Sequence, residues 1–416
     1  MIVWGAIVFL NAFTFPKALI PLGRGGILSI MKALTGTETE TLAGLEKKLM
    51  GHLLECAEVN KVKGHGGLTI LKPSATVYSG IWPDDFLFPQ IVCRDLLTKD
   101  ELQDTLIFLT DSITDLECVP DRVELDGLPV MQPGWYDSPH SYRMPMHLPA
   151  AWMRLLSYAE EWGVEIPHKD RWARIITKSF EHVPFSCGLA YIDPQRPYVG
   201  FGFFDPNRIS GFELMSSMIL YRGLIRASKT FTGLVDDKTI RHWNDLAAGV
   251  EKNITRLYVP ELNGFAAGSV GCRQFSVWAN GLAYWMPGID DSIKKGIVQN
   301  YEDNADVLFR YGFTRQIIEE TGWKSLYKDI PVGHYTNGGY WSTGTGFVLP
   351  ALMDGKRPLA FRLLNDLADN LEHFDFTEWT DRDGNNSGAM KFLMGMAIPL
   401  LALKGIREGR SFLEYF

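Results

Sequence analysis

Apolar residues recur at helical spacing from one end of this chain to the other, and this periodicity constrains its fold more than any other feature. Steps of three and four residues place apolar side chains on one face of an α-helix. One such stripe runs over Leu42, Leu45, Leu49, Leu53 and Cys56, and others cover residues 102–113, 152–159, 212–225, 240–257, 360–371 and 389–403. The pattern predicts amphipathic or fully buried helices throughout the chain.

The segments between these stripes are long and rich in Gly, Pro, Asp and aromatic residues. They cover residues 80–89, 127–149, 191–211, 264–287 and 332–346. Loops of this length in a compact domain are usually functional, and we expect some to carry short β-hairpins. No linker or charge block divides the chain. We therefore expect an apolar or extended N-terminal segment over residues 1–35 and a single all-α domain over residues 36–416.

The charge and the cysteines exclude several classes of protein. A net charge of −8, with no basic stripe, disfavours nucleic acid as a partner. The five cysteines are scattered and include no Cys-x-x-Cys pair, so they indicate neither a disulfide framework nor a zinc site.

The N-terminal residues 1–15 are apolar but too few to span a membrane. As a signal peptide they lack a positively charged start and a clear cleavage site of small residues. No other segment approaches eighteen apolar residues, so we expect no membrane span. The sequence leaves open whether the protein is cytoplasmic or is exported with residues 1–15 as a signal segment, and it leaves the oligomeric state open.

Two adjacent carboxylates, Asp84 and Asp85, follow Trp82 near the start of an expected helix. Such a pair can accept hydrogen bonds from sugar hydroxyls while the indole stacks on a sugar face. The same carboxylates could instead serve only as the cap and acidic first turn of a helix.

A second polar cluster, over residues 134–152, precedes another apolar stripe. It contains Trp135, Asp137, Arg143 and His147. These residues are candidates for contacts with a substrate. A single His or Arg in such a loop is about as often a structural hydrogen-bonding group.

A third candidate, Asp205, follows a glycine–aromatic run at residues 198–204 and precedes a predicted buried helix. Apolar surroundings would raise the pKa of its carboxyl toward the range of a general acid. The alternative is that Asp205 only caps the helix.

A fourth candidate segment, residues 334–346, places Tyr335, Asn337 and Trp341 among four glycines. Glycine lets the backbone approach a ligand closely, and aromatic faces suit the C–H faces of sugars. The alternative is an aromatic hairpin in the core.

The fifth candidate, Glu378, lies among aromatic residues ahead of Gly384 and the last apolar stripe. Asp381 and Asp383 resemble part of a calcium loop, but the remaining ligand spacing is missing, so a structural Ca²⁺ there is only weakly indicated. The alternative for this segment is plain surface acidity.

Two separated carboxylates among aromatic residues are the groups that glycoside hydrolysis needs. One protonates the leaving oxygen, and in an inverting enzyme the other deprotonates a water on the opposite face of the sugar. No Gly-x-Ser-x-Gly, His-Glu-x-x-His, P-loop or dinucleotide-binding motif competes with this interpretation.

Taken in order, these five segments resemble the (α/α)6-barrel, or six-hairpin, glycosidases, which include the glucoamylase-like inverting enzymes. Trp82 to Asp85 matches the Trp-x-x-Asp element of that family, and Asn337 to Trp341 matches its Asn-Gly-x-x-Trp element. The family usually has Arg where this chain has Asp84, which leaves the identity of the sugar open. The resemblance covers roughly residues 75–405.

The resemblance implies an all-α fold, an (α/α)6 barrel of six helical hairpins with long loops. By position it implies Asp205 as the general acid and Glu378 as the general base. It implies a carbohydrate substrate and requires no cofactor or metal. Two alternatives remain: a sugar epimerase, isomerase or uronate-processing enzyme on the same barrel, relying on His140, His147, His334 or Tyr335, and a non-catalytic carbohydrate-binding barrel.

Overall fold

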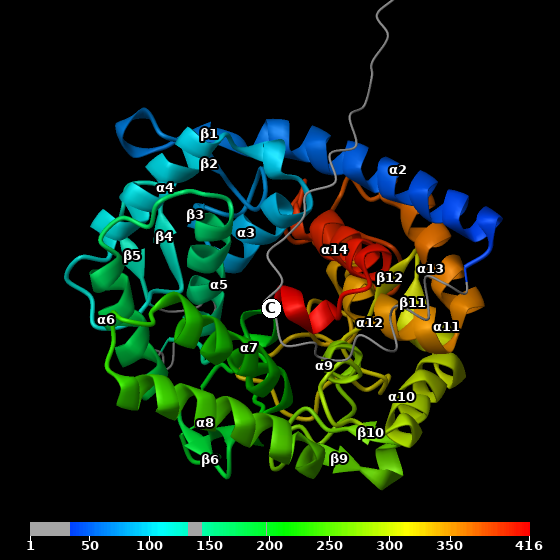
Figure 1. The fold of residues 1–416 in the computed structure, drawn as a ribbon. Coiled ribbons are helices and arrows are strands. Elements are labelled where there is room, and N and C mark those ends of the chain that lie inside the picture. Colours follow the sequence, from blue (N-terminus) through cyan, green and yellow to red (C-terminus); the bar gives the residue numbers. More distant parts are fainter. Residues whose placement is uncertain (1–33, 132–143, 197) are drawn as a thin grey trace, which may run out of the picture.

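The structure, a computed structural model, describes residues 34–131, 144–196 and 198–416. Its helices form two concentric rings, as Figure 1 shows. The inner ring consists of α3 (Pro83–Val92), α5 (Leu148–Glu161), α7 (Leu214–Thr230), α9 (Val277–Ala283), α12 (Ser342–Gly355) and α14 (Met394–Glu408). The outer ring consists of α2 (Gly36–Asn60), α4 (Lys99–Ser112), α6 (Lys169–Glu181), α8 (Asp237–Asn253), α10 (Asp291–Asp303) and α13 (Arg357–Asn370). A single turn, α11 (Ala305–Leu308), follows α10.

Contacts between neighbouring inner helices close the ring. In chain order each inner helix packs on the next, and α14 returns to α3. Outer helices lie against inner ones: α6 contacts α5, α8 contacts α7, α10 and α13 contact α12, and α2 contacts α14. The chain therefore alternates between an outer and an inner helix around the ring, which confirms the predicted (α/α)6 barrel.

Burial separates the two rings as the apolar periodicity requires. In α8 only Trp243, Ala247 and Val250 are buried, which is a single stripe on an otherwise polar helix. In α12 every residue from Ser342 to Met353 is buried. Gly346 lets α12 approach the backbone of α14 at Ile398, where a Cβ would clash. A helix buried on all sides shows no polar face, so periodicity alone did not reveal α3, α9 or α12.

The strands are short, antiparallel and confined to the loops. They are β1 (Lys61–Lys63), β2 (Thr69–Leu71), β3 (Gly80–Ile81), β4 (Arg122–Glu124), β5 (Pro129–Val130), β6 (Phe185–Ser186), β7 (Leu189–Ile192), β8 (Gly211–Phe212), β9 (Tyr258–Val259), β10 (Gly264–Phe265), β11 (Phe309–Arg310), β12 (Phe313–Thr314), β13 (Trp379–Thr380) and β14 (Asn386–Ser387). In one three-stranded sheet β4 pairs with both β3 and β5. This pairing brings the residues around 121 beside those around 82.

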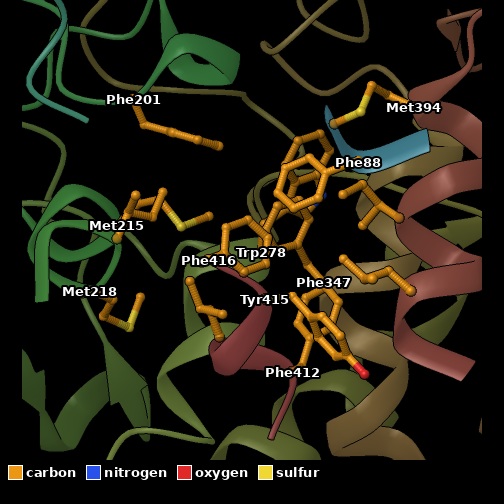
Figure 2. Close-up of a cluster of buried hydrophobic side chains, with 14 of the residues drawn as sticks. Phe88, Phe201, Met215, Met218, Trp278, Phe347, Met394, Phe412, Tyr415 and Phe416 are labelled. Carbon is orange, nitrogen blue, oxygen red and sulfur yellow. The ribbon is translucent and has the colours of Figure 1, made fainter. Parts of the chain in front are cut away.

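The chain ends in the middle of the ring. The short helix η6 (Phe412–Tyr415) and Phe416 lie at its centre in Figure 1. Figure 2 shows the rings of Phe412, Tyr415 and Phe416 beside Phe88 and Phe347 of the inner helices. Arg226, near the C-terminal end of α7, binds the carbonyl oxygens of Glu414 and Phe416. The C-terminal segment thus fills the end of the barrel where the inner helices finish.

The first described helix, α2, begins with a capping box. The side chains of Thr35 and Glu38 each accept a hydrogen bond from the other residue's backbone N–H. The apolar segment predicted over residues 1–35 lies outside the described residues, apart from its last two positions. In the part of the chain that the structure describes, no helix is long and apolar enough to cross a membrane.

Candidate active site

A cavity of about 700 Å³ opens at the end of the barrel where the inner helices begin. Its wall is assembled from segments far apart in the sequence. It includes Asp84 and Asp85 in the first turn of α3, His147 at the start of α5, Asp205 before α7, Tyr335 before α12 and Glu378 before α14. The helix N-termini that face this region favour negatively charged or hydrogen-bond-accepting groups.

Most of the candidate residues from the sequence meet at this cavity. Its wall contains Trp82, Asp84, Asp85, His147, Asp205, Tyr335 and Glu378. Trp135, Asp137 and Arg143 lie outside the described residues, so their predicted substrate contacts stay predictions. His140, named for the epimerase alternative, also lies outside them.

Asn337 and Trp341, expected to touch substrate, are instead placed behind the wall. The Asn337 amide accepts from the backbone N–H of Trp323 and donates to the carbonyl of Ile330, both at 2.7 Å. Trp341 is fully buried and donates from Nε1 to the carbonyl of Tyr335 at 3.1 Å. Ile330 and Tyr335 line the cavity. Asn337 and Trp341 therefore stabilise the cavity wall from the protein interior behind it.

Glu378 is buried in the wall with 6% of its surface exposed. Oε1 accepts a hydrogen bond from the Tyr78 hydroxyl at 3.1 Å, and Oε2 accepts one from the backbone N–H of Ala389 at 2.9 Å. Burial raises the pKa of Glu378 to about 7, although both hydrogen bonds oppose this shift by stabilising the carboxylate. A base with a pKa near neutrality is suited to removing a proton at physiological pH.

Asp205 lies in the same wall, directly after the short helix η3 (Gly202–Phe204). It is buried, and burial raises its pKa well above the ordinary value of an aspartate. The negative charges of Glu378 and Asp121 raise it further, whereas a hydrogen bond from Tyr335 lowers it. These surroundings favour the protonated form of Asp205, which is the form that a general acid needs.

The two carboxylates of α3 have different partners. Asp84 is bound on Oδ1 by the guanidinium of Arg154, and its Oδ2 lies 3.5 Å from Nε2 of His147. Asp85 has no hydrogen-bond partner on Oδ1 among the described residues. Burial and the charge of Asp84 raise the pKa of Asp85 well above its ordinary value. Asp85 is thus the carboxyl of this pair with hydrogen-bonding capacity left for a ligand.

His147 is neutral at physiological pH, because burial lowers its pKa to about 4 despite the nearby charge of Asp84. Its backbone N–H donates to the carbonyl of Gly200, which fixes the start of α5 beside the loop that carries Asp205. A neutral imidazole can orient a substrate hydroxyl but carries no positive charge to bind an anion.

Several wall residues have no signal in the sequence. Tyr78 precedes β3 by two residues, and Asp121 and Arg122 arrive through the pairing of β4 with β3. Asp121 accepts a hydrogen bond from Trp82 Nε1 at 3.1 Å, and the Arg122 guanidinium lies over the Trp82 ring at 5.0 Å. These contacts hold the indole of Trp82 in the wall, and only the folded chain reveals them.

The segment around Asp381 and Asp383, which resembled part of a calcium loop, forms hydrogen bonds within itself. One carboxylate oxygen of Asp381 accepts from the backbone N–H groups of Asp383 and Asn385, and the other accepts from the Asn385 side chain. Over the described residues, no group of three or more His, Cys, Asp or Glu side chains could hold a metal ion. The prediction that no cofactor is needed remains a prediction.

No protein-family model matches the chain, and no curated protein matches it. Solved structures with a similar fold are found. The chain is similar to the GH63 mannosylglycerate hydrolase from Thermus thermophilus in complex with glucose, at 16% identity and a TM-score of 0.56, over 85% of this chain and 99% of that chain.

Two further solved structures show the same likeness. A wild-type glycosidase matches at 14% identity and a TM-score of 0.51, over 90% of this chain and 100% of that chain. A bacterial glucoamylase in complex with acarbose matches at 12% identity and a TM-score of 0.54, over 86% of this chain and 54% of that longer chain. At such identities the likeness is one of fold. The chain therefore has the (α/α)6-barrel fold that these glycoside hydrolases share.

Proposed function

We propose that this protein is a glycoside hydrolase that cleaves a glycosidic bond by acid and base catalysis. The observation that carries the proposal is the pairing of two buried carboxyls, Asp205 and Glu378, in the wall of one cavity, where burial raises the pKa of each. Buried carboxyls with raised pKa values that line one cavity are candidates for acid and base catalysis. The shared fold supports the same interpretation.

In this mechanism the protonated Asp205 gives its proton to the glycosidic oxygen as the bond to the anomeric carbon breaks. The ionised Glu378 takes a proton from a water molecule, whose oxygen forms the new bond to that carbon from the opposite face. The product then has inverted configuration. After release, Asp205 regains a proton from solvent and Glu378 loses one. We expect the two carboxyl groups to be separated by about 6.5–9.5 Å, the space that an inverting enzyme leaves for the water.

The rest of the cavity wall fits a sugar. Trp82, Tyr335 and Trp379 supply aromatic surface for the apolar faces of a pyranose ring. Asp85, whose Oδ1 has no hydrogen-bond partner among the described residues, supplies a group that can bind hydroxyls. We assign the activity to residues 36–416 acting as one domain. One structural neighbour, a mannosylglycerate hydrolase, was solved with glucose bound, and another, a glucoamylase, with acarbose bound, so glucosides and mannosides are the first substrates to test here.

The test is a panel of aryl glycosides and disaccharides of glucose and mannose, followed by release of reducing sugar. Proton NMR of the anomer formed first then reports whether configuration is inverted. We expect Asp205→Asn and Glu378→Gln each to lower kcat by at least about 10²-fold. Glu213→Gln is the matched control, because Glu213 is also a buried carboxyl but caps α7 and does not line the cavity.

Full activity in either cavity variant would remove that residue from the mechanism. Isomerised sugar without hydrolysis would favour the epimerase alternative. Sugar binding without turnover would favour the non-catalytic barrel. A product of retained configuration would exclude only the inverting mechanism and would leave the proposal of a glycoside hydrolase in place.

A further inference from the structure

Arg154 is a charged residue enclosed in the core of the barrel. It lies in α5, its side chain is 1% exposed, and it is among the largest fully buried side chains of the protein. Its guanidinium lies 4.0 Å from the centroid of the Phe88 ring and 5.1 Å from that of Phe416. Enclosing a guanidinium between two aromatic rings removes it from water, so its charge must be compensated within the protein.

The two ends of the guanidinium have different partners. Nη2 binds Oδ1 of Asp84 in the cavity wall. Nη1 donates to the carbonyl oxygen of Tyr415 at 3.3 Å. Arg154 therefore connects the start of the inner helices, where the cavity lies, with the C-terminal segment that fills the other end of the barrel.

The C-terminal segment is itself anchored independently of Arg154. Arg226 binds the carbonyl oxygens of Glu414 and Phe416 at 2.8 and 3.2 Å and the hydroxyl of Ser157 at 3.1 Å. Figure 2 shows Tyr415 and Phe416 among the aromatic side chains of the inner ring. Arg154 thus binds a C-terminal segment that Arg226 also holds in place.

Asp84, which Arg154 holds in place, contacts residues that line the cavity. Its second oxygen faces Nε2 of His147, and its charge is one of the causes that raise the pKa of the neighbouring Asp85. If Asp84 moved, the ring of His147 would lose a partner and the surroundings of Asp85 would change. Both His147 and Asp85 line the cavity.

We propose that Arg154 is a positioning residue for the candidate site, which holds the Asp84 carboxylate in the cavity wall while the C-terminal segment holds Arg154 from the opposite end of the barrel. Arg154 does not line the cavity and is not expected to touch substrate. The kinetic part of this inference rests on the proposed glycosidase function. The structural part does not.

The test compares Arg154→Met and Arg154→Lys with Arg226→Met in the full-length protein. Using the glycoside that the wild type hydrolyses best, we expect Arg154→Met to raise KM by about 10-fold to 100-fold, with a smaller change in kcat. Arg154→Lys should recover part of the affinity, because an ammonium keeps the charge but cannot reach both partners as the planar fork does. Arg226→Met should lower the melting temperature and raise KM less than Arg154→Met does, because it loosens the segment that holds Arg154 but leaves the contact between Arg154 and Asp84 in place.

The Arg154→Met variant leaves the Asp84 carboxylate without its cation and is at risk of unfolding. The Arg154→Met/Asp84→Asn double variant removes that charge, so it should fold and retain a raised KM. The two substitutions should also be non-additive, with the double variant no worse than the worse single one.

A crystal structure of whichever Arg154 variant folds supplies a readout that does not depend on turnover, since the residue 84 side chain should leave its wild-type position. If no glycoside is hydrolysed, the proposed function fails while this structural readout still decides the inference. An unchanged position of residue 84, an unchanged KM, or an equal rise in KM for Arg226→Met would overturn it.

Discussion

The hydroxyl of Tyr78 lies 3.1 Å from Oε1 of Glu378 and donates a hydrogen bond to it, although the two residues are 300 positions apart in the chain. This bond stabilises the ionised carboxylate and so opposes the rise in pKa that burial causes. In the proposed mechanism Glu378 must be ionised to accept a proton from water. Tyr78 therefore influences the pH range in which the enzyme works.

Tyr78→Phe removes this donor without emptying the space that the ring occupies. The pKa of Glu378, already raised to about 7, should rise further, by about one unit. The acidic limb of the profile of kcat/KM against pH should move to higher pH by the same amount, so activity falls most below neutrality. Tyr340→Phe is the control, because its hydroxyl donates to the carbonyl of Val307 and lies outside the cavity wall. An unmoved acidic limb would separate Tyr78 from the ionisation of the base.

The raised pKa of Glu213 predicts how the free energy of unfolding depends on pH, whatever the function of the protein. It caps α7 by accepting hydrogen bonds from the backbone N–H groups of Met215 and Ser216, yet burial raises its pKa to about 7. Because the folded-state pKa exceeds the ordinary value of 4.5, the stabilisation is complete below about pH 4.5 and is lost as pH rises through about 7. The free energy of unfolding should fall by roughly 3 kcal/mol over this window.

Glu213→Gln should remove this dependence. Chemical denaturation at about pH 5 and about pH 8 should show a smaller loss of unfolding free energy in the variant than in the wild type. A constant offset between the two proteins reports the weaker cap and does not affect the comparison. Equal pH dependence in both proteins would mean that Glu213 titrates normally.

The periodicity of the sequence predicted the outer helices because each must keep one polar face, whereas their arrangement in a ring was implied by the family resemblance. The stripe at 240–257 became α8, and the stripe at 360–371 became α13. It also predicted the two carboxyls, Asp205 and Glu378, that now lie in one cavity, because each stands beside aromatic residues in its own short segment. Local sequence was sufficient where a residue's neighbours in the chain are also its neighbours in space.

The sequence could not predict what depends on pairing between distant segments. Tyr78 reaches Glu378 only because the ring closes between α14 and α3. Arg154 reaches Tyr415 only because the C-terminal segment lies inside the ring. For the same reason Trp341 was expected in the pocket but is buried behind it, since its aromatic and glycine-rich surroundings resemble those of a ligand-binding loop. Composition does not distinguish the face of a loop that meets substrate from the face that meets the core.

Trp82 is the wall aromatic whose role is simplest to test. Its ring contacts Tyr78 edge-on at 4.8 Å between centroids, and Asp121 and Arg122 hold it in place. If a sugar stacks on it, Trp82→Ala should raise KM by about tenfold with little change in the pH profile, and Trp82→Phe should have a smaller effect. Trp162→Ala is the control, because Trp162 is also partly exposed but lies at the far end of α5. A KM unchanged in Trp82→Ala would place the sugar elsewhere in the cavity.

Gly388 lies against the carboxylate that we assign as the base. A Cβ at this position would clash with Oε2 of Glu378. Gly388→Ala should therefore push Glu378 out of place, and a displacement of about 1 Å is enough to lower kcat by about 10²-fold. Alanine also carries a backbone cost here, because Gly388 has a φ of 75°.

Gly384 supplies the matched control for that cost. It lies in the same segment with a φ of 83°, but the nearest atom to its Cβ position belongs to Tyr311 rather than to Glu378. Gly384→Ala and Gly388→Ala should share a similar backbone cost in the free energy of unfolding, about 1 kcal/mol, since both force alanine into the same backbone region, and the clash at residue 388 adds a further loss only in Gly388→Ala. Only Gly388→Ala should lose activity. Equal kcat values in the two variants would mean that the clash at residue 388 does not disturb the position of Glu378 that the reaction needs.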